Sequence, residues 1–157
     1  MAREEVFNAA KSAFSMYGGL FNGIAQEIGM EKALELHAKQ GESFGAMIGE
    51  MLRQQLGNKG PDTKTFSSIL RLLYVGFGFD AEFDVGPTSI SIKVTRCPFY
   101  EGARMARLDH ETIGNMCKAM ANAEYTKLKE YYPKTEGKVK YRESPEGYCL
   151  EQFTLKE

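Results

Sequence analysis

The chain has 157 residues, of which 43% are hydrophobic and 26% are charged, and its 20 basic and 21 acidic residues leave a net charge of −1. These proportions are typical of a soluble globular protein, and the length predicts a single domain over residues 1–157. The near balance of charge argues against a nucleic-acid or anionic-membrane partner held by bulk charge. No apolar run approaches the length needed to span a membrane, which argues against a membrane partner.

The beginning of the chain, MAREEVFNAAKSAF, has no apolar segment behind a basic tip. We therefore expect no signal peptide and a cytoplasmic protein. Three cysteines are an odd number in such a chain. Reduced thiols are the expectation, and any role for them would be metal binding or reactivity rather than disulfide formation.

The first half of the chain has the apolar periodicity of helices. Apolar residues at three- and four-residue steps predict a first helix through Ile28, with a kink or interruption at Gly18-Gly19. A second helix is predicted from about Met30 to Leu56, and a third begins with Asp62 or Thr63 as N-cap.

The second half alternates strands with a helix. Residues 81 to 95 alternate with period two and predict a hairpin, after which residues 98 to 108 are expected to form a loop. Asp109 is a good N-cap for a long helix over 110–132, and KVKYRE and YCLEQFTL predict a second hairpin. This order predicts an α+β fold, in which N-terminal helices pack on one face of a small antiparallel sheet of two hairpins with a long helix between them.

The second predicted helix carries Gly41, Gly45 and Gly49 at four-residue steps. Each interior glycine costs roughly 1 kcal/mol relative to alanine, so the row needs a compensating close approach of another backbone. Packing against a helix of the same chain is the preferred interpretation. A homodimer seam through this helix is the second, and a bound ligand is the third.

The three cysteines and one histidine form the candidate site. Cys97 ends the second predicted strand, His110 and Cys117 lie seven residues apart on one helix face, and Cys149 lies on the inward face of the last strand. Thiolate and imidazole are ligands that zinc and other transition metals prefer, so Cys97, His110, Cys117 and Cys149 would close a tetrahedral site. The cysteines alone would leave a position open for water.

Two other interpretations of the thiols stay open. No C-x-x-C pair is present, so spacing alone favours three buried structural cysteines over a metal site. His110, in the first turn of its predicted helix, is then a solvent-exposed residue. Cys97 is also the best candidate for a reactive thiolate, because Arg96 and Arg104 flank it. His37 lies on the glycine row and is expected to be a packed or interface residue rather than a ligand.

These residues carry a resemblance to a known family. Cys97-Pro98, Cys117 and Gly147-Tyr148-Cys149 followed by Phe153 resemble motifs of the L-2-amino-thiazoline-4-carboxylate hydrolase-like family. That family is similar to 4-vinyl reductase-type domains and to subunits of transport protein particles in its α+β layout. The resemblance covers about the C-terminal two-fifths by motif, and the N-terminal half agrees in layout.

The resemblance implies a compact α+β domain that often forms dimers and a cysteine-lined pocket for a small molecule or metal. It also implies addition of water to a C–N bond, with Arg96, Arg104 or Arg107 as candidates to bind a substrate carboxylate. The 4-vinyl reductase-like domains that bind zinc tend to have an acidic residue and a further cysteine upstream of the last cysteine. Here the corresponding stretch, KVKYRESPEGY, has no cysteine.

Three functions follow as hypotheses. The first is a hydrolase-like enzyme for a small-molecule C–N bond, with catalytic Cys97, Cys117 and Cys149 and a zinc or other transition-metal ion. The second is a non-enzymatic sensor domain that binds a small molecule or metal. The third is a dimeric interaction scaffold in which the cysteines are structural and the glycine row is the functional surface.

Overall fold

The computed structural model describes residues 3–57 and 60–156. Over these residues the α+β class is confirmed, with five helices and one antiparallel sheet of four strands. In chain order the elements are α1 (Glu4–Ile28), α2 (Met30–Leu56), α3 (Thr63–Gly76), β1 (Asp80–Val85), β2 (Ser89–Arg96), α4 (Pro98–Met105), α5 (His110–Tyr131), β3 (Thr135–Lys140) and β4 (Cys149–Leu155).

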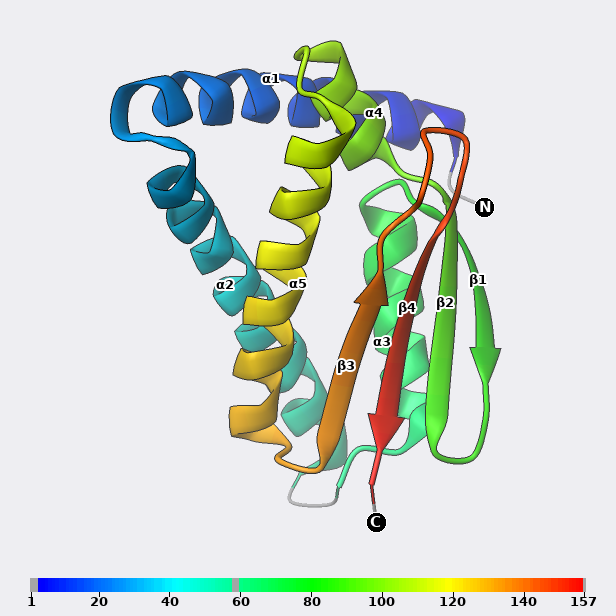
Figure 1. The fold of residues 1–157 in the computed structure, drawn as a ribbon. Coiled ribbons are helices and arrows are strands. Elements are labelled where there is room, and N and C mark those ends of the chain that lie inside the picture. Colours follow the sequence, from blue (N-terminus) through cyan, green and yellow to red (C-terminus); the bar gives the residue numbers. More distant parts are fainter. Residues whose placement is uncertain (1–2, 58–59, 157) are drawn as a thin grey trace.

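The strands lie in the order β1-β2-β4-β3, so the central pair β2 and β4 joins two antiparallel pairs that are distant in sequence (Figure 1). Ile90 is paired with Phe153 and Val94 with Cys149 in this central ladder. The register places the Cys149 side chain on the same face as the buried β2 residues Ile90, Ile92 and Val94. The C-terminal strand is therefore a central element of the core.

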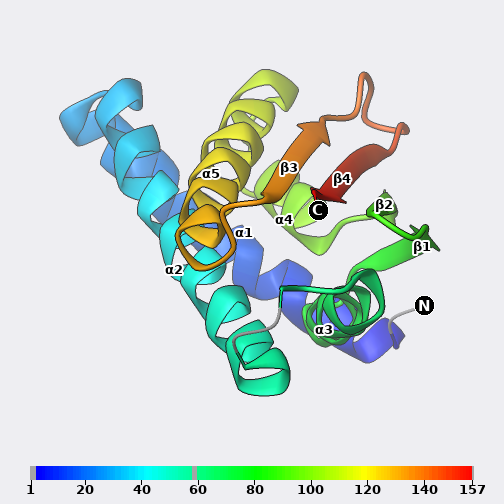
Figure 2. The same cartoon turned by 90° about the horizontal axis from the view of Figure 1, so that it is seen from below.

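Helices cover one face of the sheet. Seen from below, α3 and α5 lie on the same side of the four strands, and α2 lies beyond α5 (Figure 2). The inward positions Glu151, Phe153 and Leu155 are buried, whereas Gln152 and Thr154 between them are exposed. This alternation explains why the sheet needs helices on one side only.

The predicted loop over residues 98 to 108 is wrong, because this segment forms helix α4. Pro98 stops the strand ladder, but it also occupies the first turn of a helix, where its missing N–H costs nothing. The Cys97 sulfur caps this helix by accepting the backbone N–H of Tyr100 at 3.3 Å. The helix ends before Arg107, whose φ of 66° is in the left-handed region. Cys97 therefore has a structural role.

Helix α1 is continuous through Gly18-Gly19, so the predicted interruption there is wrong. Gly18 packs closely on α4, because a Cβ at Gly18 would lie 3.0 Å from Cβ of Ala106. Gly18 therefore serves as a small residue at a helix contact, and the hydrogen bonds of α1 continue past it.

The glycine row of α2 packs against α5 of the same chain, which is the preferred of the three interpretations. A Cβ at Gly41 would lie 2.0 Å from the carbonyl oxygen of Met120, and a Cβ at Gly45 would lie 2.3 Å from that of Glu124. Gly49 similarly faces the ring of Tyr131. Since α5 occupies the row, a homodimer through α2 would need another face of the helix, and this oligomeric state stays a prediction.

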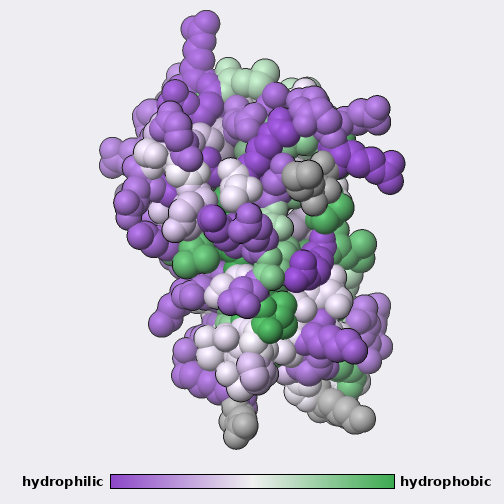
Figure 3. Space-filling view, turned by 90° about the vertical axis from the view of Figure 1, so that its right-hand side faces the viewer, coloured by the Kyte–Doolittle hydropathy of each residue, from purple (hydrophilic) through white to green (hydrophobic). Residues whose placement is uncertain are grey.

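The surface on the side of β1 is mostly hydrophilic, with separate hydrophobic patches (Figure 3). Exposed hydrophobic side chains include Leu72 and Val75 of α3 and Val85 of β1. Within residues 3–57 and 60–156, no helix combines the length and the apolar character that crossing a membrane requires.

Candidate functional site

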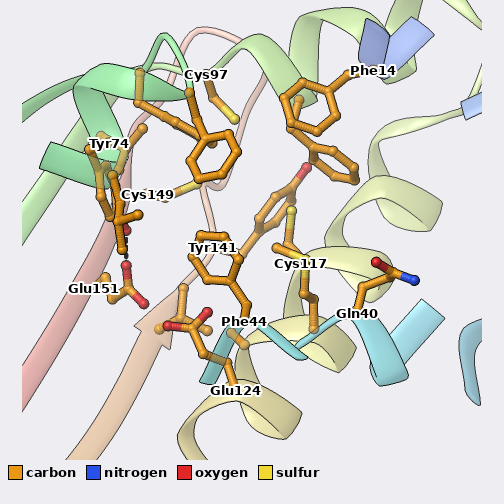
Figure 4. A pocket seen from close by; sticks show the side chains of 18 of the residues that line it. Phe14, Gln40, Phe44, Tyr74, Cys97, Cys117, Glu124, Tyr141, Cys149 and Glu151 are labelled. Atoms are coloured by element: carbon orange, nitrogen blue, oxygen red, sulfur yellow. Dashed lines mark hydrogen bonds between the residues drawn. The ribbon is translucent and has the colours of Figure 1, made fainter. Parts of the chain in front are cut away.

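A cavity of about 400 Å³ lies between the α2–α5 helix pair on one side and α3 with the sheet on the other. All five helices and the sheet contribute side chains to its lining, and most of these side chains are aromatic or aliphatic (Figure 4). The aromatic lining residues are Phe14, Tyr17, Phe44, Tyr74, Phe77, Phe79, Phe99 and Tyr141. A cavity of this size and lining suits a small, largely apolar molecule.

The cavity opens to solvent between α2 and α3. Gln40 on α2 and Phe77 after α3 both line it, yet both side chains are exposed. The ring of Phe44 lies 5.4 Å from that of Phe77, centroid to centroid, and so bridges the two sides of this opening. A ligand would enter past this aromatic pair.

All three cysteines line the cavity. They come from three different elements: Cys97 at the end of β2, Cys117 on α5 and Cys149 at the start of β4 (Figure 4). The three predicted site cysteines therefore share one cavity, and the convergence of their sulfurs on a single point stays a prediction. The metal-ligand set is less favoured, because among the described residues no three His, Cys, Asp or Glu side chains are grouped to hold an ion.

Burial keeps two of the thiols protonated. It raises the pKa of Cys97 to about 12, against weaker opposing effects of the Tyr100 N–H and the Arg142 charge. It also raises the pKa of Cys117 well above its ordinary value, with Cys97 and Cys149 adding to the shift. Since the thiolate is the nucleophile, Cys97 and Cys117 are poorly activated in the empty cavity.

His110 lies outside the cavity lining, unlike the three cysteines. Its Nδ1 is 3.1 Å from the Tyr100 hydroxyl, and its ring is 5.1 Å from that of Tyr141. His110 therefore packs against Tyr141, which itself lines the cavity. A role for His110 as a metal ligand stays a prediction with no geometric support.

The three arginines proposed for a substrate carboxylate also lie away from the cavity. Arg96 forms a bidentate ion pair with Glu4 at 2.7 and 3.0 Å and stacks 3.5 Å from the ring centroid of Phe7. Arg104 in the last turn of α4 and Arg107 just after the helix are exposed. Arg96 therefore links the end of β2 to the first turn of α1 through its ion pair with Glu4.

Glu151 is a functional candidate that the sequence reasoning missed. It is buried in the cavity wall on β4, and the hydroxyls of Tyr74 and Tyr125 each donate a hydrogen bond to one of its carboxyl oxygens. Burial raises the pKa of Glu151, and the two donated hydrogen bonds oppose that shift. The tyrosines therefore favour the charged form of this carboxyl.

Glu124 on α5 is the second missed carboxyl. It is 7% exposed, lines the cavity and has no hydrogen-bond partner among the residues that the structure describes. Burial, with the adjacent Glu151, raises the pKa of Glu124 well above its ordinary value. Since Glu151 has two donors and Glu124 has none among the described residues, the proton of this pair is held more strongly at Glu124 than at Glu151.

His37 also lines the cavity, and its protonation state follows from two contacts. Its Nε2 lies 3.1 Å from the carbonyl oxygen of Met116, which can only accept, so Nε2 carries the proton. Nδ1 then accepts from the Tyr17 hydroxyl at 2.6 Å. Burial lowers the pKa of His37, which keeps the ring neutral, and the prediction of a packed histidine fits this geometry.

A buried arginine, Arg142, lies behind the thiols. It is 5% exposed and stacks 4.4 Å from the Tyr100 ring centroid, while Nη1 donates to the carbonyl of Pro145 at 3.2 Å. Its Nε and Nη2 have no oxygen or nitrogen partner within the described part of the chain. Its charge lowers the pKa of Cys97 and Cys117, but burial of these thiols has the larger effect.

Comparison of the chain with models of protein families, with curated proteins and with solved structures finds no match. The resemblance to the thiazoline-carboxylate hydrolase-like family therefore stays a prediction from short motifs. The cavity and its chemistry carry the functional argument.

Proposed function

We propose that this chain is a binding domain for a small, largely apolar molecule, which enters the cavity past Phe44 and Phe77. The observation that carries the proposal is the cavity of about 400 Å³ with its mainly aromatic wall. Such a cavity excludes water from most of a ligand's surface, and burial of that surface supplies the binding free energy. The proposal corresponds to the sensor-type hypothesis from the sequence.

A filling substitution tests this proposal. Ala121 is buried and lines the cavity, so Ala121→Leu places three additional carbon atoms in the binding space. Ala13 is exposed on α1 and provides a matched control, Ala13→Leu. The probe is Prodan, an uncharged naphthalene fluorophore whose emission shifts to the blue in apolar surroundings.

We expect saturable blue-shifted emission with the unchanged chain and with Ala13→Leu. The Ala121→Leu variant should weaken Prodan binding at least about tenfold, since a filled cavity no longer accepts the ring system. Equal binding by all three proteins would place the probe on the surface and contradict the proposal. Circular dichroism and urea unfolding establish that each variant is folded.

Hydrolysis of a C–N bond is the second candidate, because Cys97, Cys117 and Cys149 line the same cavity. The raised pKa values of Cys97 and Cys117 weaken the version in which either of them is the nucleophile. The metal version is tested by metal analysis of untagged protein purified without chelator. Less than about a tenth of an equivalent of any transition metal would contradict a tightly held zinc ion.

A further inference from the structure

The cavity wall is unbalanced in charge. Two carboxyl groups, those of Glu124 and Glu151, belong to it, but none of its described residues is a lysine or an arginine. The one histidine in the wall, His37, is neutral and has both ring nitrogens engaged by Tyr17 and Met116. The buried Arg142 lies behind the thiols and is not among the groups that shift the pKa of either carboxyl, so a ligand that complements the carboxyl end of this wall brings a positive charge.

The two carboxyl groups approach the same part of the cavity from opposite walls. Glu124 extends from α5 and Glu151 from β4, toward one another (Figure 4). Glu151 is held in place by Tyr74 and Tyr125, whereas no described residue donates to Glu124. The Glu124 carboxyl is 7% exposed and lines the cavity, so a ligand in the cavity can supply the donor that the described residues do not.

We propose that the cavity binds an apolar amine as its ammonium ion, with the apolar part among the aromatic rings and the nitrogen between Glu124 and Glu151. This inference rests on the proposed function and adds the chemical class of the ligand. An ammonium group has up to three N–H donors, and a carboxylate has about four acceptor sites. Two sites on Glu151 are used by tyrosines, so both carboxyls retain free acceptors.

Aromatic side chains near the carboxyls add to the selectivity for a cation. Tyr74 and Phe44 line the cavity on the α3 and α2 sides. A cation near the face of an aromatic ring gains about 0.5–2 kcal/mol, and more when it is desolvated. Neutral or anionic molecules of the same shape gain nothing from this term.

Binding of an ammonium ion changes the protonation of Glu124. The groups that bear on this carboxyl are Glu151 on β4, Tyr74 on α3 and Tyr125 on α5, none of which is cationic. The raised pKa of Glu124 means that the empty cavity holds a proton there. An ammonium ion displaces that proton, so binding releases about one proton to the buffer.

The test compares three ligands of similar shape by isothermal titration calorimetry at pH 7: 2-(1-naphthyl)ethylamine, 2-(1-naphthyl)ethanol and the carboxylate anion 1-naphthaleneacetate. We expect the amine to bind at least about tenfold more tightly than the alcohol, and the anion most weakly. The amine is also titrated in phosphate and in Tris, two buffers that differ in ionisation enthalpy. The difference between the two observed binding enthalpies should correspond to about one proton released per bound amine.

Glu124→Gln removes the ionisable group and keeps its shape. We expect this variant to lose the preference for the amine and the proton release, while its affinity for the alcohol stays within about twofold of the unchanged chain. Glu111→Gln is the matched control, because Glu111 lies exposed in the first turn of the same helix. It should behave like the unchanged chain toward all three ligands.

Two results would overturn the inference in distinguishable ways. Equal binding of the amine and the alcohol, unaffected by Glu124→Gln, would mean that the cavity takes an uncharged ligand, and the proposed function would stand without the amine. Absence of binding by all three ligands, together with no Prodan binding, would contradict both the amine and the proposed function.

Discussion

Tyr17 on α1 donates its hydroxyl proton to Nδ1 of His37 on α2 over 2.6 Å, in the wall of the cavity. The other ring nitrogen of His37 donates to the Met116 carbonyl on α5. One neutral imidazole therefore links three helices at the cavity. This link fixes the positions of Tyr17 and His37 in the wall before any ligand arrives.

Replacement of Tyr17 by phenylalanine should destabilise the protein by about 1–3 kcal/mol, because it leaves a buried ring nitrogen without its donor. Urea unfolding monitored by circular dichroism measures the change. Tyr148→Phe is a suitable control, since Tyr148 is 52% exposed and should change the free energy of unfolding by less than about 0.5 kcal/mol. Equal effects of the two substitutions would show that the Tyr17–His37 contact contributes nothing to stability.

The packing of α2 on α5 predicts opposite effects for two glycine-to-alanine substitutions. At Gly41 the added Cβ would collide with the Met120 backbone carbonyl, so Gly41→Ala should cost at least about 2 kcal/mol. At Gly23 on α1 nothing lies within 4 Å of the added Cβ, so Gly23→Ala should stabilise by about 0.5–1 kcal/mol through helix propensity. Stability measurements that show Gly41→Ala to be neutral would contradict the packing of this row.

The pH dependence of stability reports on Glu124. Its pKa is raised in the folded protein above the ordinary value of 4.5. The contribution of Glu124 to the free energy of unfolding is therefore fully present below pH 4.5, and it is lost as pH rises through the raised pKa. Glu124→Gln removes this loss. The variant should therefore be more stable than the unchanged chain at pH 7, and this difference should shrink as pH falls toward 4.5.

Unfolding free energies at several pH values between 4.5 and 7.5 test this expectation, with Glu111→Gln as the control for a charge change on the same helix. A pH-independent difference between Glu124→Gln and the unchanged chain would mean that Glu124 titrates normally in the folded state. Such a result would also remove the reason for proton release on amine binding.

The buried thiols should react slowly. With a pKa of about 12, the Cys97 thiolate is about one part in 10⁴ at pH 8, and Cys117 is shifted in the same direction. In a Cys149→Ser variant, we expect the two remaining thiols to react with iodoacetamide at least about 100-fold more slowly in the native protein than in guanidinium. Rates equal to those of a free cysteine would contradict the burial of these thiols, and rates above them would support the activated thiolate of an enzyme.

Much of the helix layout could be predicted from local signals. Asp62 and Asp109 accept the backbone N–H groups of Thr65 and Thr112 at 2.7 Å, so both predicted caps are confirmed. The row of Gly41, Gly45 and Gly49 correctly indicated a close helix contact within the chain. Helix α4 was missed because a proline after a strand usually signals a loop, and the cap here is a sulfur.

The two carboxyls of the site could have been found from the same spacing that placed the cysteines. Glu124 lies seven residues after Cys117, on the same helix face, and Glu151 shares the inward face of β4 with Cys149. A glutamate on an otherwise apolar face of a helix or strand indicates a buried carboxyl group. The cavity itself could not be predicted, because its volume depends on how far α2 and α5 lie from α3, which no local pattern encodes.

Methionine methyl groups offer the most direct test of the central claim, that a small apolar molecule binds inside this cavity. Met120 lines the cavity, whereas Met16 is 79% exposed and Met105 is 59% exposed. With ¹³C-methyl-labelled methionine, titration with 2-(1-naphthyl)ethylamine should shift the Met120 signal and leave those of Met16 and Met105 unchanged. A shift at the exposed methionines without one at Met120 would place the ligand on the surface and contradict the claim.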